Sequence, residues 1–140
     1  MLSNPFDESI QGYGYEDLLL AKALKEKGVE ILHIDNPVQH LGLETSKVFL
    51  KKTTNAIDNL IQLRHTGKGI ATRLETFAGK LERWGIDKYF IKYYKHREAA
   101  IEANLLSPKP RIRNLDAFKL YCYYRIQKAR ENKNQDFSQE

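Results

Sequence analysis

Apolar side chains recur at helical spacing along most of the chain, between short runs of glycine, proline and polar residues. They repeat every three or four residues, which is the period of a helix with one buried face. The pattern breaks at Gly28, at residues 65–69, at Gly85 and at residues 107–110. It therefore predicts helices over residues 16–27, from 45 or 46 to the break at 65–69, over 70–84, over 87–106 and over 114–129.

Residues 29–34, Val-Glu-Ile-Leu-His-Ile, break this pattern because they are apolar and β-branched. Such a run is typical of a short buried strand, ended here by Asp35, Asn36 and Pro37. Within the strand, His33 is expected to be buried and hydrogen-bonded. A single strand cannot form a sheet, so we expect its pairing partners to lie upstream of Met1.

Composition fits one folded domain of ordinary size. The chain has 140 residues, of which 41% are hydrophobic and 29% charged. No apolar run approaches the roughly 18 residues of a membrane-spanning helix, and the N-terminus has no signal-peptide pattern. The single cysteine, Cys122, allows no internal disulfide and is expected in the core. We expect a cytoplasmic protein.

The net charge of +5 is unevenly distributed. Residues 109–133 hold eight Lys or Arg against two acidic residues, a net charge of +6. Three interpretations remain: a solvated helix face, adhesion to an anionic membrane surface at the inner face, and nucleic-acid binding, which ranks last. In the membrane interpretation the rings of Phe118, Tyr121, Tyr123 and Tyr124 lie at headgroup depth.

The stretch Gly12-Tyr13-Gly14-Tyr15-Glu16-Asp17 places two Gly-aromatic steps before two carboxylates at the start of the first helix. Acidic residues in a first turn complement the helix dipole, and the tyrosines could pack on the helix that follows. One capping acceptor would satisfy the helix, however, so the doublet is also a candidate catalytic site. His40, six residues after the apolar run, is either a surface histidine or a metal ligand.

Taken in order, these features resemble the C-terminal half of the catalytic domain of family-two, GT-A-type glycosyltransferases. Residues 6–42 contain the Phe-Asp-Glu lead-in, the Gly-aromatic-Gly-x-Glu-Asp loop opening a helix, a strand and a downstream histidine. The resemblance implies inverting transfer of a sugar from a nucleotide-sugar donor to a glycan or lipid-linked acceptor. It also implies a fold class: an α-rich α/β chain, the end of a GT-A domain over residues 1–66 and a helical extension over 67–140.

The resemblance also implies roles for the site residues. Asp17 would be the general base for the acceptor hydroxyl, and Glu16 would bind the acceptor. Gly12, Tyr13, Gly14 and Tyr15 would form the mobile wall of the acceptor site. His40 would hold a divalent manganese or magnesium ion, which supplies positive charge to the departing diphosphate.

One departure from the family pattern concerns the donor site. No Asp-x-Asp motif occurs in the chain, and the nucleotide-binding half of the family domain has no counterpart. We therefore expect a partial gene product with acceptor-side residues and no donor site of its own. The alternative is a non-catalytic helical interaction module that retains these residues as relics.

Overall fold

The computed structural model describes residues 14–30, 32–39, 42, 44–67 and 71–136. These residues form five helices: α1 (Glu16–Glu26), α2 (Ser46–His65), α3 (Arg73–Arg83), α4 (Asp87–Leu105) and α5 (Ile112–Asp136). All five expected helices are present. The last begins at Ile112, two residues before the expected Asn114.

The expected α/β fold class is wrong. In the ranges that the structure describes there are helices and no strand, which conflicts with the end of a GT-A domain. The described residues of 29–34 have no regular secondary structure, and the side chains of Leu32 and Ile34 are 80% and 71% exposed. A strand needs a paired neighbour to satisfy its backbone, and no described segment pairs with this one. His33, expected to be buried, is exposed for the same reason.

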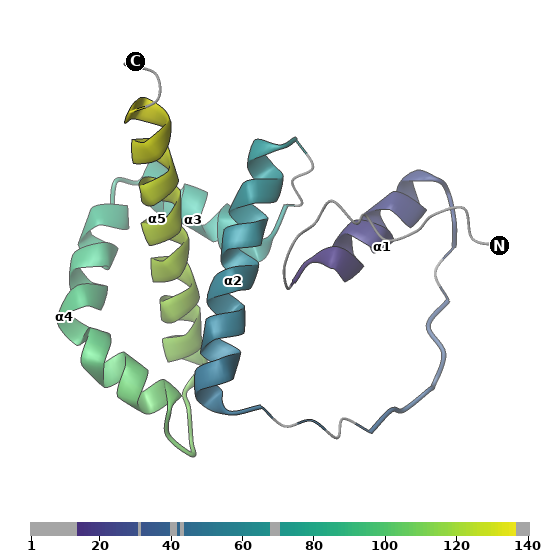
Figure 1. Ribbon diagram of the computed structural model, residues 1–140, viewed down its shortest axis with the longest axis horizontal. Coiled ribbons are helices and arrows are strands. Elements are labelled where there is room, and N and C mark those ends of the chain that lie inside the picture. Colours follow the sequence, from purple (N-terminus) through teal and green to yellow (C-terminus); the bar gives the residue numbers. More distant parts are fainter. Residues whose placement is uncertain (1–13, 31, 40–41, 43, 68–70, 137–140) are drawn as a thin grey trace.

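Helix α5 is the centre of the fold. It contacts α2, α3 and α4, and α3 also contacts α4 (Figure 1). In the same view α1 lies apart from these four helices, joined to α2 by a long connection. Since α2 belongs to the first of the two expected parts and α5 to the second, the two parts meet in one core; the boundary at residue 66 stays a prediction.

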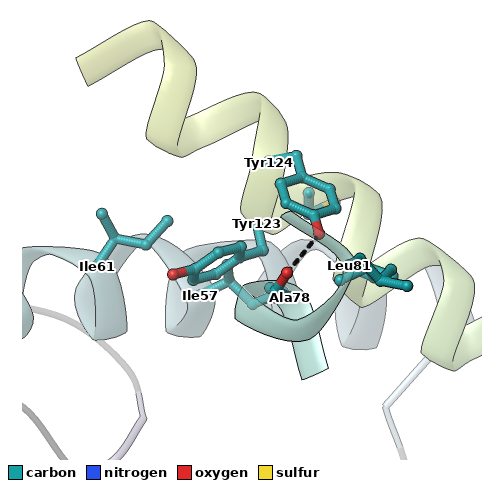
Figure 2. Close-up of a cluster of buried hydrophobic side chains, with 8 residues drawn as sticks. Ile57, Ile61, Ala78, Leu81, Tyr123 and Tyr124 are labelled. Atoms are coloured by element: carbon teal, nitrogen blue, oxygen red, sulfur yellow. Dashed lines mark hydrogen bonds between the residues drawn. The ribbon is translucent and has the colours of Figure 1, made fainter. Parts of the chain in front are cut away.

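The core contains two neighbouring clusters of buried side chains. The larger joins α2, α3 and α5 (Figure 2) through Ile57, Ile61, Ala78, Leu81, Leu120, Cys122, Tyr123 and Tyr124. The smaller joins α4 and α5 through Tyr94, Ile101, Leu105 and Tyr121. In it the rings of Tyr94 and Tyr121 stack with centroids 4.1 Å apart. Helical spacing correctly predicted burial at Ile57, Leu60, Ile61 and Leu81.

Side-chain hydrogen bonds tie the helices together around this core. The guanidinium of Arg64 on α2 donates to the hydroxyl of Tyr123 on α5 at 2.8 Å. On the outer side of the same pair of helices, Arg130 donates from Nε and Nη2 to one carboxylate oxygen of Asp58, at 3.0 and 2.6 Å. Both contacts fix the orientation of α5 against α2.

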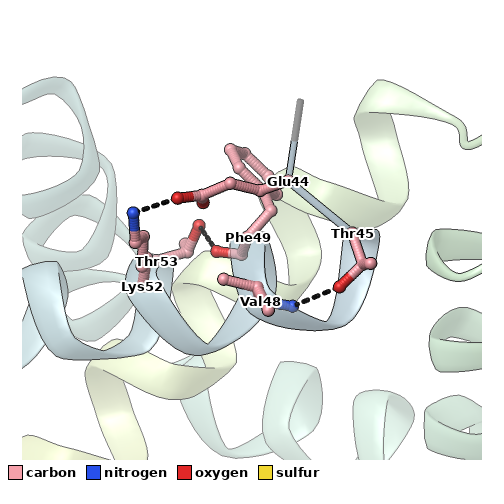
Figure 3. A network of polar contacts seen from close by, with 6 residues as sticks. All are labelled: Glu44, Thr45, Val48, Phe49, Lys52 and Thr53. Atoms are coloured by element: carbon pink, nitrogen blue, oxygen red, sulfur yellow. Dashed lines mark hydrogen bonds and ion pairs between the residues drawn. The ribbon is translucent and has the colours of Figure 1, made fainter. Parts of the chain in front are cut away.

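Polar side chains and glycines set the helix ends. Thr45 caps α2 by accepting a hydrogen bond from the Val48 amide at 3.4 Å, beside the ion pair of Lys52 with Glu44 (Figure 3). Thr72 and Glu75 form a capping box at the start of α3. Gly85 ends α3 with φ at 68°, a left-handed conformation that glycine adopts at low cost. The expected cap of α4 by Asp87 is wrong, because the helix begins there and no side chain caps it.

Candidate functional site

The Gly-aromatic loop enters α1 through a left-handed turn. Gly14 has φ at 109° and Tyr15, directly before the helix, has φ at 73°. A tyrosine in this region is strained, and such backbone persists only where its surroundings hold it. The carbonyl of Tyr15 accepts the first helical hydrogen bond, from the Leu19 amide at 3.0 Å.

The turn is held against α2 and near α3. A Cβ atom added to Gly14 would lie 2.7 Å from Cβ of Ala56, so only glycine fits this approach. The phenol of Tyr15 is partly buried. Burial raises the pKa of Tyr15, and the nearby Glu75 carboxylate raises it further. The first turn of α1 is thus anchored to the four-helix core even though the rest of α1 lies apart from it.

Asp17 follows this anchored turn with its side chain exposed. Its Oδ1 accepts a hydrogen bond from the Leu18 amide at 2.8 Å. It lies in the first helical turn, where unpaired amides favour negative charge. Of the other expected site residues, Glu16 opens the helix, whereas its side chain, Gly12, Tyr13 and His40 lie outside the described residues.

The described residues do not supply the expected manganese or magnesium site. They contain no group of three His, Cys, Asp or Glu side chains that could hold a metal ion. His33, the competing ligand, is exposed in the connection after α1. We therefore assign no step to a metal.

A second candidate site, which sequence reasoning missed, is a groove between α3, α4 and α5. Its volume is about 1240 Å³, and we call it the α3–α5 groove. Its walls include the apolar or aromatic side chains of Leu74, Phe77, Leu81, Ile86, Tyr89, Phe90, Tyr93, Ala117 and Leu120. Phe77, expected in the core by its spacing, is 53% exposed there. Apolar positions in excess of one buried stripe were the available signal, at Tyr89 and Tyr93, which are one turn apart.

The tyrosines of the basic segment 109–133 are core residues. Tyr121, Tyr123 and Tyr124 are at most 8% exposed, and Phe118 is partly buried against both clusters. They are therefore not at headgroup depth, which corrects that part of the membrane interpretation. Arg113 and Lys119 from this segment line the α3–α5 groove instead. No helix in the described part of the chain has the length and apolar character needed to cross a membrane.

Cys122 is a core residue, as expected. It is 1% exposed, and its Sγ lies 3.8 Å from the hydroxyl oxygen of Thr54. Burial raises the pKa of the Cys122 thiol above its ordinary value, which disfavours the nucleophilic thiolate. This position indicates packing between α2 and α5 and not chemistry.

The likeness to a known family thus rests on the motifs of residues 6–42. No family model, curated protein or solved structure matches the chain.

Proposed function

We propose that this chain takes part in inverting transfer of a sugar from a nucleotide-sugar to a glycan or lipid-linked acceptor, with Asp17 as the general base. The observation that carries the proposal is the placement of Asp17. Its exposed carboxylate follows directly on a left-handed turn that is anchored to α2. The order of motifs over residues 6–42 supplies the reaction class.

In the proposed step, the acceptor hydroxyl oxygen attacks the anomeric carbon of the donor sugar. The bond between that carbon and the diphosphate oxygen breaks, and its electron pair leaves with the diphosphate. Because a hydroxyl is a weak nucleophile, its proton must pass to a base as the new bond forms. The carboxylate of Asp17 accepts that proton, and the sugar inverts its configuration.

The turn before α1 contributes position in this proposal. Strained backbone at Tyr15 and the close approach of Gly14 to Ala56 fix where the first turn of α1 begins. Since a base must lie within hydrogen-bond reach of the acceptor, a shift of this turn would slow the reaction. The donor and its diphosphate are held in this proposal by groups outside the described residues.

The experiment is a transfer assay on the purified chain with a panel of nucleotide-sugars, pooled glycan and lipid-linked acceptors, and manganese or magnesium. Release of nucleoside diphosphate that requires an acceptor is the expected result. Asp17→Asn should abolish it, whereas Asp35→Asn, which changes another exposed acid in the described chain, should not. Absence of turnover, together with absence of glycan binding in calorimetry, would overturn the proposal.

The second candidate function is a non-catalytic helical interaction module. It is favoured by the α3–α5 groove, an apolar surface at the far side of the core from α1 in neither expected site. The two functions differ in their response to one variant. Binding by a module should be unaffected by Asp17→Asn, whereas sugar transfer should be lost.

A further inference from the structure

Large apolar side chains gather around the corner where α3 meets α4. Phe77, Ile86, Tyr89 and Tyr93 line the α3–α5 groove and are 53%, 41%, 75% and 58% exposed. Trp84 ends α3 next to them and is 66% exposed. Single exposed apolar residues are ordinary, but a contiguous group of this kind marks a surface that binds something.

The same surface is basic. Arg73, Lys80, Arg113 and Lys119 line the groove, and Asp116 is the one acidic residue among the lining residues. Along the chain, residues 71–97 contain seven Lys or Arg against three acidic residues. One of these three, Glu75, is occupied in the capping box with Thr72. The partner of this surface should therefore be negatively charged and apolar beneath its charge.

We propose that the α3–α5 groove and the adjoining Trp84 dock on the surface of an anionic lipid bilayer. Indole and phenol rings prefer the membrane interface because their apolar bodies enter the acyl region while their polar ends stay hydrated. Lysine and arginine beside them reach the headgroup phosphates through flexible apolar stems. The proposal depends on this surface alone and does not require sugar transfer.

The position of Trp84 favours a bilayer over an acidic helix from another protein. Trp84 is not among the residues lining the groove, so a helix seated in the groove would leave its ring in water. A bilayer surface is broad enough to cover the groove and the corner together. The docking residues come from α3, α4 and the first turns of α5, and none is needed by the α2–α5 contact that holds the core.

The chain carries its own probe, because Trp84 is its single tryptophan. Vesicles of phosphatidylcholine with phosphatidylglycerol should shift its fluorescence to shorter wavelength, and brominated acyl chains should quench it. Vesicles of phosphatidylcholine alone should leave both unchanged. Raising the salt to about 0.5 M should weaken binding severalfold by screening. An unchanged spectrum with anionic vesicles would overturn the proposal, as would a shift without vesicles that grows with protein concentration and so reports a second copy.

Matched variants separate this surface from the overall charge. Lys80→Glu with Arg113→Glu should weaken partition to anionic vesicles by at least about 25-fold, at roughly fivefold per basic residue. Lys47→Glu with Lys51→Glu changes the net charge equally on exposed positions of α2 and should weaken it only a few-fold. Equal losses in the two double variants would overturn the proposal.

A second pair tests the aromatic contribution. Tyr89→Ser should weaken partition on the order of fivefold, whereas Phe49→Ser, which removes an exposed ring on α2, should not. Equal effects of the two would count against the proposed surface. Unchanged circular dichroism and melting should accompany every variant, since all the altered side chains are exposed. Asp17→Asn should bind vesicles normally, so failure of the proposed sugar transfer and failure of lipid docking are distinguishable.

Discussion

The hydroxyl of Tyr124 on α5 donates a hydrogen bond of 3.0 Å to the backbone carbonyl of Ala78 on α3 (Figure 2). Both residues are buried, so the bond forms where water does not compete for either group. The nearby Tyr94 differs. Its ring is fully buried, yet its hydroxyl has no hydrogen-bond partner among the described residues. Two core tyrosines should therefore respond with opposite sign to the same substitution.

Tyr124→Phe should lower the free energy of unfolding by about 1 kcal/mol, because it removes a buried hydrogen bond and keeps the ring. Urea denaturation followed by circular dichroism measures this change. Tyr89→Phe is the control, since Tyr89 is 75% exposed and should change stability by less than about 0.5 kcal/mol. An equal loss in both variants would assign the effect to something other than the bond to Ala78.

Tyr94→Phe should leave stability unchanged or raise it by about 1 kcal/mol, because it removes a buried hydroxyl that has lost its water without gaining a partner. The stacking on Tyr121 is retained, since phenylalanine keeps the ring. The same urea titration applies. A loss as large as that of Tyr124→Phe would contradict the structure at this position.

Alkaline pH should destabilise the fold through Tyr124. Burial, with the Glu82 and Asp87 carboxylates adding to it, raises the pKa of Tyr124 to about 12 from an ordinary value of 10.0. Between these two values the unfolded chain loses the proton while the folded chain keeps it. The free energy of unfolding should therefore be constant below pH 10 and fall by about 1.4 kcal/mol per pH unit toward pH 12 for this group.

Urea midpoints taken at pH 9, 10, 11 and 12 measure this slope. Tyr124→Phe is the comparison, because it removes the titrating group and should make the slope shallower. The other core tyrosines and Cys122 also have raised pKa values and contribute in the same direction. An unchanged slope in Tyr124→Phe would show that this phenol does not carry its share of the alkaline loss.

Helices were predictable here because each contains its own signals. Thr45, Gly28 and Gly85 act within a few residues of the ends that they set, and Ile57 with Ile61 repeats at helical spacing. The strand expected over residues 29–34 was not, because a strand is stabilised by a neighbour that its own sequence does not specify. The fold class followed that error.

The candidate sites show the same limit. The start of α1 at the Glu16-Asp17 doublet was predictable from local sequence, whereas the contact of Gly14 with Ala56 joins residues far apart in the chain. The α3–α5 groove was missed because periodicity shows that Phe77 and Trp84 are apolar positions but not that their faces remain uncovered. Coverage depends on how α3, α4 and α5 pack against one another.

Gly14→Ala should open the first turn of α1. The added Cβ meets Ala56 at 2.7 Å, and φ at 109° is unfavourable for any residue with a side chain. Gly28→Ala is the matched control, because its φ of 69° is also left-handed but nothing lies within 4 Å of the added atom. Because α1 lies apart from the main core, the effect should be local, and amide hydrogen exchange measures it better than melting.

The Leu19 amide, which bonds the Tyr15 carbonyl, should exchange faster in Gly14→Ala than in Gly28→Ala. Ala56→Gly on its own removes the atom that the new Cβ would meet, so it should restore part of the protection in the double variant. Backbone strain at residue 14 would remain, and recovery should therefore be incomplete. Equal exchange in the two glycine variants would mean that contact with α2 does not hold the turn, and the positioning of Asp17 proposed above would lose its physical basis.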